Sequence, residues 1–212
     1  MNVADIRKDY SLRELDILHV DKDPIVQFNN WMKEAIGSEC LEPTAMVLST
    51  VSSEGRPSSR VMLLKGVEEK SFVFYTNYNS RKGNAIKENA FVSLNFFWAE
   101  LERQVRIEGK VEKVSASVSD EYFNSRPIGS RIGAHVSPQS QKIPDRLFLE
   151  DMVKTKTEEF KNKEVTRPEH WGGFRVNPDR IEFWQGRPSR LHDRILFELS
   201  PNGEWEISRL AP

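Results

Sequence analysis

The stretch TAMVLSTVSSEGRPSSRVMLLKGVEEKSFVFYTN, residues 44–77, decides the fold. It contains three apolar runs rich in β-branched residues, at 44–52, 58–67 and 71–77. Turn-forming residues separate these runs, first at 53–57 and then at 68–70. Short strands about 10 residues apart, with turn signals between them, are typical of antiparallel hairpins. We therefore predict three consecutive antiparallel strands in this part of the chain.

The sequence on either side of this stretch extends the pattern. Asp23 and Pro24, a cap and a first-turn proline, precede apolar residues at helical spacing, and Gly37 follows them, which predicts a helix over 24–37. A short helix is expected over 80–89, and a second hairpin over 91–99 and 102–115. Five strands with one inserted helix are typical of a barrel.

The second half of the chain mixes helices with late strands. We expect helices over 117–125 and 144–163, the latter long and charged, with a glycine-punctuated stretch up to residue 140 between them. Strands are expected over 172–176, 180–185, 190–199 and 205–210. Because these strands need partners, they are expected to complete the early sheet. The interpretation is one α+β domain over 21–212, preceded by a mobile polar arm over 1–20.

Composition and absent motifs narrow the function. With 31 Lys and Arg against 32 Asp and Glu, the net charge of -1 argues against a protein held to nucleic acid by its phosphates. No apolar run is long enough to span a membrane, the first residues do not resemble a secretory signal, and the single Cys40 forms no internal disulfide, so we expect a cytoplasmic protein. The glycine loops, histidine pairs and G-x-S-x-G elbow of nucleotide-binding, zinc and hydrolase sites are absent, so no metal is predicted.

Cations within strands and at a helix start are the informative feature. Arg60 and Lys65 are five residues apart, on opposite faces of a regular strand, so both would serve one site only across a bulge or a strand end. The alternative is that one of them faces solvent. Arg81 and Lys82 follow Ser80 at a helix N-terminus, where cations are unfavourable unless a phosphate joins them. The alternative is two solvated surface charges.

A second candidate segment is RLHDR, residues 190–194. In a strand, Arg190, His192 and Arg194 would share one face, with Trp184 offering an aromatic surface just upstream. Aromatic, arginine and histidine side chains together suit a flat, anionic, heteroaromatic ligand. The alternative is an exposed edge strand whose charges prevent pairing with other chains.

A third candidate is the spacing of Tyr122, Arg126 and Ser130, although Pro127 and Gly129 indicate that the helix ends near residue 125 or 126. Tyrosine, arginine and serine meeting at a helix end could hold a second phosphate; alternatively they form an ordinary helix surface. Other polar groups that could bond to a ring edge, or lie on the surface, are Gln104, Gln139 and Ser140. The residues alone leave a nucleotide, a flavin and a vitamin phosphate open.

The motifs in their order resemble the pyridoxine/pyridoxamine 5'-phosphate oxidase family, from about residue 6 to the last residue. The segments that carry the resemblance are RVMLLK (60–65), FYTN (74–77), SRK (80–82), LERQVRIEGK (101–110), YFNSRP (122–127), GSRIGAHVSPQSQ (129–141), WGGFRV (171–176), IEFWQG (181–186), RLHDR (190–194) and RLAP (209–212). The resemblance implies a split β-barrel flavoprotein that works as a homodimer, with FMN bound at the interface.

The resemblance also implies site residues. The FMN contacts would be Arg60, Val61, Met62, Leu63, Leu64, Lys65, Tyr75, Thr76, Arg81, Lys82, Gln104, Gln139, Ser140, Trp184 and Arg194. The substrate contacts would be Lys65, Tyr122, Arg126 and Ser130 on its phosphate, Arg190, Leu191 and His192 over its ring, and Arg7, Lys8, Asp9 and Tyr10 in an arm that acts as a lid. Arg190 and His192 would be the catalytic residues, Arg190 orienting the substrate and His192 positioning it or managing a proton.

The implied reaction oxidises the 4' carbon of pyridoxamine or pyridoxine 5'-phosphate to the aldehyde, with a hydride passing to the flavin and O2 becoming H2O2. Three alternatives stay open. One is a related flavin reductase or an oxidase for another substrate, which should lack the Tyr122, Arg126 and Ser130 set. The others are a carrier of flavin or pyridoxal phosphate that produces no peroxide, and a colourless barrel that binds single-stranded nucleic acid.

Overall fold

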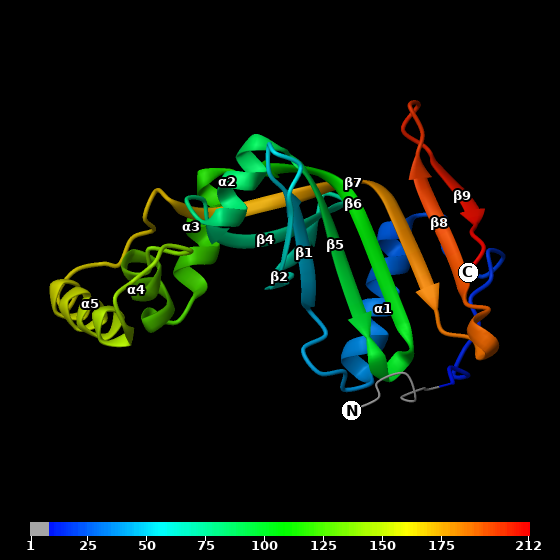
Figure 1. Cartoon of the computed structure of the whole chain (residues 1–212), viewed down its shortest axis with the longest axis horizontal. Coiled ribbons are helices and arrows are strands. Elements are labelled where there is room, and N and C mark those ends of the chain that lie inside the picture. The colour runs from blue at the N-terminus through cyan, green and yellow to red at the C-terminus, as the bar shows by residue number, and fades with distance from the viewer. Residues whose placement is uncertain (1–8) are drawn as a thin grey trace.

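The computed structural model describes residues 9–212, and Figure 1 shows them as one curled antiparallel sheet with helices around it. The strand order is β2-β1-β5-β6-β7-β4-β3, while β8 pairs with β7 and β9 pairs with β8. The strands are β1 Ala45–Val51, β2 Pro57–Leu63, β3 Gly66–Glu68, β4 Ser71–Asn77, β5 Phe91–Trp98, β6 Arg103–Lys113, β7 Trp171–Gln185, β8 Asp193–Leu199 and β9 Trp205–Arg209. The helices are α1 Pro24–Gly37, α2 Arg81–Glu88, α3 Ala116–Ser125, α4 Ile128–Val136 and α5 Arg146–Glu159, with short 3-10 turns η2 Ala99–Leu101 and η3 Pro188–Arg190.

The expected α+β class and the mainly antiparallel split-barrel sheet with flanking helices are confirmed. Helix α1 covers the concave side of the sheet, and the side chain of Asp23 caps it by accepting from the N–H of Ile25. Phe28 on this helix is fully buried, with its ring centroid 4.9 Å from that of Phe72 and 5.1 Å from that of Phe96. Burial of such aromatic rings supplies much of the energy that holds a sheet curled around a helix.

Strand β7 connects the two halves of the molecule (Figure 1). The two strands expected at 172–176 and 180–185 are one continuous strand, which corrects that prediction. Its first part pairs with β4, its last part with β8, and residues 174–185 with β6. The proline at 178 is tolerated because the register shifts there, opposite Gly109. A Cβ on Gly109 would lie 2.2 Å from the carbonyl oxygen of Asn177, so only glycine fits.

The strand expected over 58–67 breaks in two. Leu64 donates its N–H to Thr44 on the β1 side, and Lys65 donates its N–H to Val73 in β4. The chain therefore leaves one edge of the sheet and joins the other between these two residues. Arg60 therefore lies in β2 and Lys65 lies beyond its end, so the two side chains are not restricted to opposite faces of one regular strand.

The glycine-punctuated stretch after residue 125 contains a helix that the sequence did not predict. Helix α3 ends at Ser125, as expected, and Pro127 begins the turn into α4. Tyr122 and Ser130 therefore lie on different helices, and Ser130 is exposed in the first turn of α4. The helix end expected near residue 125 or 126 is thus confirmed, and the proline at 127 separates Tyr122 from Ser130.

The strand expected over 190–199 begins only at Asp193. Arg190 lies in the turn η3 with a φ of 62°, after Ser189 with a φ of 56°. Arg190, His192 and Arg194 therefore do not share one strand face. Residues 1–8, including the predicted Arg7 and Lys8, lie outside the described residues, and the division into a mobile arm and one domain stays a prediction. Within residues 9–212 there is no helix with the length and apolar character needed to cross a membrane.

Candidate active site

Buried cations gather where β4 leads into α2. The Ser80 side chain caps the helix by accepting from the N–H of Gly83. Lys82, only 8% exposed, donates from Nζ to Thr76 Oγ1 at 3.2 Å and to Gln139 Oε1 at 3.1 Å. Both acceptors are neutral. Burial, and then the positive charge of a nearby arginine, lower the pKa of this lysine, so an anion beside it would relieve a real electrostatic cost.

That arginine is Arg60, and its partners are neutral as well. The guanidinium donates to Leu48 O at 3.0 Å, to Thr50 Oγ1 at 2.9 Å and to Ser58 Oγ at 2.6 Å. Burial, and then the charge of Arg81, lower its pKa. Three cations thus lie in one another's field at a helix N-terminus. A phosphate is the ligand that such an arrangement suits, because it accepts from helix N–H groups and pairs with guanidinium and ammonium groups.

An aromatic wall with one arginine stands beside these cations. The rings of Tyr75 and Tyr122 are stacked with centroids 3.8 Å apart, and Trp171 continues the stack 5.6 Å from Tyr75. Burial raises the pKa of Tyr75 to about 12, so its phenol is neutral at physiological pH. The Arg126 guanidinium lies 4.5 Å from the Trp171 ring centroid, and its buried Nη1 has no hydrogen-bond partner within residues 9–212. That donor is available to an anion.

Two adjoining cavities bring many of the predicted residues together. One cavity of about 320 Å³ is lined by Met62, Leu63, Lys65, Tyr75, Thr76, Lys82, Tyr122, Arg126 and Gln139, together with Asn77 and Trp171. Another of about 440 Å³ is lined in part by Arg81, Gln139 and Ser140, and by the Thr50 and Ser58 side chains that hold Arg60. Gln139 lines both cavities. This end of the molecule therefore has the size and charge for ligands carrying two phosphates.

A second group of predicted residues lies at the other end of β7. The His192 ring lies 4.7 Å from the Trp184 ring and 5.8 Å from the Tyr10 ring. Its Nδ1 accepts from the N–H of Arg187 at 3.1 Å. Burial and then the charge of Arg190 lower the pKa of His192, against a smaller opposite effect of the neighbouring carboxylate. The imidazole is therefore neutral at physiological pH.

Arg194, beside this group, is already paired with an acid. It donates from Nε and Nη2 to the two carboxylate oxygens of Glu182 at 2.8 and 3.0 Å, and from Nη1 to Ala211 O at 2.7 Å. Arg106 donates to the same carboxylate. Burial acts to raise the pKa of Glu182, but the bonds from the two arginines outweigh it and lower the pKa. Arg194 is therefore neutralised by a carboxylate of the chain itself.

The two groups are far apart on one chain. Tyr75 and Thr76 pair with Gly173 and Gly172 at the start of β7, whereas Trp184 is next to its end. Twelve residues of strand correspond to a path of about 40 Å at about 3.3 Å per residue. The predicted residues found at the far end are Asp9, Tyr10, Gln104, Trp184, Arg190, Leu191, His192 and Arg194. A single chain therefore does not unite them with the cavities.

A few predicted residues lie at neither cluster, and some residues of the clusters were not predicted. Val61 is 67% exposed on β2, and Leu64 is buried in the core. Trp171, Arg187 and Glu182 were missed as site residues. A buried acid between aromatic and aliphatic residues of a strand, as in IEFW, was the available signal for Glu182. In the described part of the chain, no group of three or more His, Cys, Asp or Glu is arranged to hold a metal ion.

Two family models match the chain. Residues 32–158 match the model described as pyridoxamine 5'-phosphate oxidase. Residues 171–212 match the model described as the pyridoxine 5'-phosphate oxidase C-terminal dimerisation region. The second match covers β7, β8 and β9, which carry the far cluster.

Curated relatives match over nearly the full length. A pyridoxine/pyridoxamine 5'-phosphate oxidase of Leptospira interrogans is 57% identical over 210 residues, which are 99% of this chain and 98% of the relative. Proteins of the same name from Chromobacterium violaceum and Nostoc punctiforme are 54% and 53% identical, covering 100% and 99% of this chain and 99% and 98% of theirs.

Solved structures share the fold. PhzG from Burkholderia lata, solved with tetrahydrophenazine-1-carboxylic acid, superposes with a TM-score of 0.90 at 27% identity, covering 97% of this chain and 100% of that one. A pyridoxamine 5'-phosphate oxidase-related, FMN binding protein from Nostoc punctiforme superposes with a TM-score of 0.70 at 15% identity, covering 87% and 97%.

The curled antiparallel sheet and these matches define an oxidoreductase built on a flavin-binding split-barrel-like fold. The groups of cations around its cavities suit phosphate groups. The smaller cavity lies between β2, β4, α2 and α3, and the larger one between β1, β2, α2 and residues 139–141. The chain belongs to the pyridoxamine 5'-phosphate oxidase family.

Proposed function

We propose that the protein is an FMN-dependent oxidase that converts pyridoxamine 5'-phosphate or pyridoxine 5'-phosphate to pyridoxal 5'-phosphate. One observation carries the proposal: of the cations that line or border two adjoining cavities, the five that the sequence analysis singled out form no ion pair with a carboxylate within residues 9–212. They are Arg60, Arg81, Lys82, Lys65 and Arg126. Two phosphorylated ligands would neutralise them. The cytoplasmic location expected from the sequence accords with this reaction.

The larger cavity fits the phosphate end of FMN. Arg81 and the capped start of α2 lie on one side, and Ser58 and Thr50 hold Arg60 on the other. Burial lowers the pKa of Arg60, so a bound dianion would remove the cost of keeping this charge buried. Lys82 and Gln139 would then continue the site toward the aromatic wall.

The smaller cavity fits the phosphate of the substrate. Lys65 reaches it from the break between β2 and β3, and Arg126 reaches it from the end of α3. The unpartnered Nη1 of Arg126 would donate to the phosphate, while the Tyr122 hydroxyl supplies a neutral donor because burial raises its pKa. Stacking of the guanidinium on Trp171 fixes its plane.

A homodimer would complete the site. In a two-fold symmetric pair, the same surfaces meet, so the far end of β7 in one protomer can face the cavities of its partner. The face of the sheet opposite α1 supports such pairing, because Val61, Leu63 and Phe97 are 67%, 36% and 54% exposed there. Asn95 Oδ1 and Arg106 Nε are buried on that face without partners within residues 9–212. FMN would then lie at the interface.

Bound FMN would supply the redox chemistry, namely acceptance of a hydride from the 4' carbon and reduction of O2 to H2O2; the alcohol would give the aldehyde, and the amine with one water would give the aldehyde and ammonia. The chain's own residues bind and orient. Arg190 would orient the substrate ring, and His192 would contact it. Trp184 and Tyr10 would exclude water from that side.

The test is an oxidase assay on purified protein of known flavin content. The proposal expects a yellow preparation with FMN absorption that releases one H2O2 for each pyridoxal phosphate formed from either substrate. A colourless protein that no added FMN colours, or a flavin-loaded protein that yields no peroxide, would overturn it. Tetrahydrophenazine-1-carboxylic acid, which carries no phosphate, serves as the comparison substrate, because faster peroxide release from it would favour chemistry resembling that of PhzG.

A further inference from the structure

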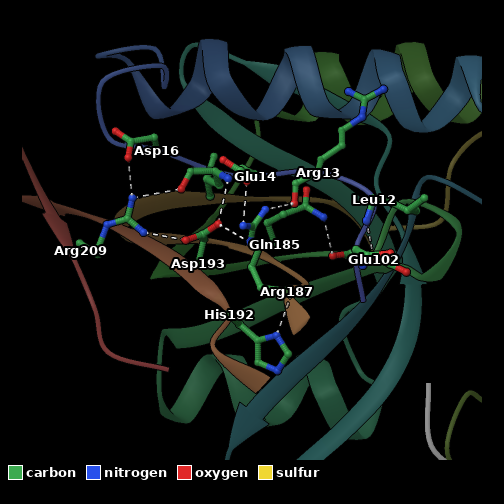
Figure 2. A network of polar contacts seen from close by, with 12 residues as sticks. Leu12, Arg13, Glu14, Asp16, Glu102, Gln185, Arg187, His192, Asp193 and Arg209 are labelled. Carbon is green, nitrogen blue, oxygen red and sulfur yellow. Dashed lines mark hydrogen bonds and ion pairs between the residues drawn. The ribbon is translucent and has the colours of Figure 1, made fainter. Parts of the chain in front are cut away.

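The turn between β7 and β8 fixes the hydrogen-bonding state of His192. The peptide N–H of Arg187 points at His192 Nδ1 from 3.1 Å, as Figure 2 shows. A peptide N–H only donates, so Nδ1 must offer a lone pair. A neutral imidazole with a lone pair on Nδ1 carries its proton on Nε2. The geometry therefore selects one of the two neutral tautomers.

The backbone that carries this donor is held from several sides. Gly186 donates its N–H to Glu102 O at 2.8 Å, and Leu191 donates to Pro188 O at 3.1 Å. A Cβ on Gly186 would lie 2.7 Å from Tyr10 Cβ, so the close approach of residue 10 requires glycine here. The non-glycine residues at 189 and 190 both have positive φ, a conformation that persists only where surrounding contacts impose it.

The Arg187 side chain ties the same turn to the segment before α1 (Figure 2). Nη2 pairs with Glu14 Oε1 at 2.8 Å, and Nη1 donates to Arg13 O at 3.2 Å. Nε lies 3.5 Å from Asp193 Oδ2, whose carboxylate also accepts from Arg209 Nη1 at 2.8 Å. The Arg187 side chain thus links its own peptide N–H, which is the donor to His192, to residues 13 and 14 and to strand β8.

The opposite edge of the imidazole carries Nε2. Within residues 9–212, Nε2 of His192 makes no hydrogen bond, and the ring packs against Trp184 and Tyr10. The charged groups around it are Arg190, which disfavours an imidazolium, and Asp193, whose carboxylate is already bonded to two arginines. The imidazole consequently stays neutral, with Nε2–H directed away from the turn.

We propose that His192 works as a hydrogen-bond donor through Nε2–H, and that Arg187 is the positioning residue that fixes this tautomer. The inference rests on the proposed function for what receives the bond, which is a lone pair on the substrate, on the 3-oxygen attached to its pyridine ring or on its 4' amine or hydroxyl. Neither nitrogen can then take a proton from the substrate: Nδ1 is occupied by a peptide donor, and Nε2 already carries hydrogen.

The direct test is ¹⁵N NMR of the full chain with labelled histidine at pH 7.5, with His192→Asn used to assign the His192 signals. The expected spectrum has an unprotonated Nδ1 and a protonated Nε2. A protonated Nδ1, or an imidazolium, would overturn the proposal. This measurement needs no turnover, so a protein with the expected tautomer but no oxidase activity would refute the proposed function and leave this inference standing.

The positioning role has a matched pair of variants. Arg187→Ala removes the ties to Glu14 and Asp193, and we expect the ¹⁵N spectrum of His192 to show a mixture of tautomers. Arg180→Ala removes an arginine of β7, which pairs with the exposed Glu198, and should leave the tautomer unchanged. A single Nε2–H tautomer in Arg187→Ala would show that the side chain does not fix the ring.

Two substitutions of His192 test the roles of its two ring nitrogens separately. His192→Asn keeps an acceptor near Nδ1 but lacks the distal donor, whereas His192→Gln can place an amide N–H near the position of Nε2. We expect kcat/KM for pyridoxamine phosphate to fall about tenfold more in the Asn variant than in the Gln variant. Equal losses, or a larger loss for Gln, would contradict a donor role at Nε2.

Discussion

The two ends of β7 hold their charges in opposite ways. Near Trp171, Lys82 is buried and Arg126 is half-buried, both beside neutral groups, and burial lowers the pKa of each. Near Gln185, Arg194 is paired with the buried carboxylate of Glu182. One strand therefore connects a region whose site cations form no ion pair within residues 9–212 to a region where the arginine is paired with an acid.

This difference indicates what each end is built for. Buried cations that lack a carboxylate partner lower the stability of the ligand-free protein. Binding of a phosphorylated ligand removes this destabilisation. Cations with acids form a rigid support that needs no ligand to hold its shape. We therefore expect substitutions at the first end to change affinity, and substitutions at the second end to change stability or orientation.

The largest effect is expected from Glu182→Ala. The change leaves the arginines at 106 and 194 without their shared acid, and should lower the free energy of unfolding by about 3 kcal/mol, at the low end for buried ion pairs because both guanidiniums are partly exposed. Urea titration measures it. Glu198→Ala, which removes an exposed partner of Arg180, is the control and should cost less than about 1 kcal/mol. Equal losses for the two variants would remove the contrast between the ends.

A slightly smaller effect is expected from Lys82→Met. Loss of a charge-assisted bond to bound FMN should weaken FMN binding by about 2 kcal/mol, or about 30-fold, measured by flavin fluorescence. The flavin-free variant should be at least as stable as the wild type, because it no longer buries an unpaired ammonium. A flavin-free variant destabilised as much as Glu182→Ala would contradict the account of this end.

Arg126→Lys tests whether the substrate phosphate and the FMN phosphate are bound at separate positions near Trp171. Lysine keeps the charge but loses the planar stack on Trp171 and the second N–H, so KM for pyridoxamine phosphate should rise about tenfold while FMN affinity stays unchanged. Steady-state kinetics and flavin titration measure the two quantities. Arg146→Lys, on the exposed side of α5, should change neither. A fall in FMN affinity would show that the two phosphate positions are not separate.

The smallest effect concerns pH and the second end. The folded state lowers the pKa of His192 below 6.5, so folding favours its neutral form. The corresponding stability is present above pH 6.5 and is lost as the pH falls through the folded-state pKa. His192→Asn should therefore lose a few tenths of a kcal/mol less than the wild type between pH 7 and pH 5, an amount kept small by solvent screening. Thermal unfolding at several pH values measures this, and parallel curves would contradict it.

Much of the sheet followed from the sequence because its signals are local. Alternating burial along β1 and β2, and turn residues between them, set the hairpins. Helix α4 was missed because Gly129 and Gly133 lower helix propensity. In the structure, Ile132 packs in a buried cluster with Phe123 and Trp171, and this burial outweighs the cost. The turn at Ser189 was missed because positive φ in a residue other than glycine gives no sequence signal.

The site was predictable to the extent that its motifs are short and contiguous. SRK at a helix start indicated an anion position, and the structure places these cations around adjoining cavities. The pairing of Arg194 with Glu182 was not predictable, because it depends on the register between β7 and β8. The distance between the two clusters was not predictable either, because it follows from β7 being one continuous strand where the sequence indicated two short ones.

The length of β7 has a genetic consequence if chains pair as proposed. One chain damaged at α2 and another damaged in the turn before β8 would together form a dimer with one doubly damaged site and one intact site. When equal amounts of the two chains pair at random, about one site in four would be intact. Two alleles that are each inactive alone would then complement one another, and the pattern of complementation would map which lesions lie at which end of the strand.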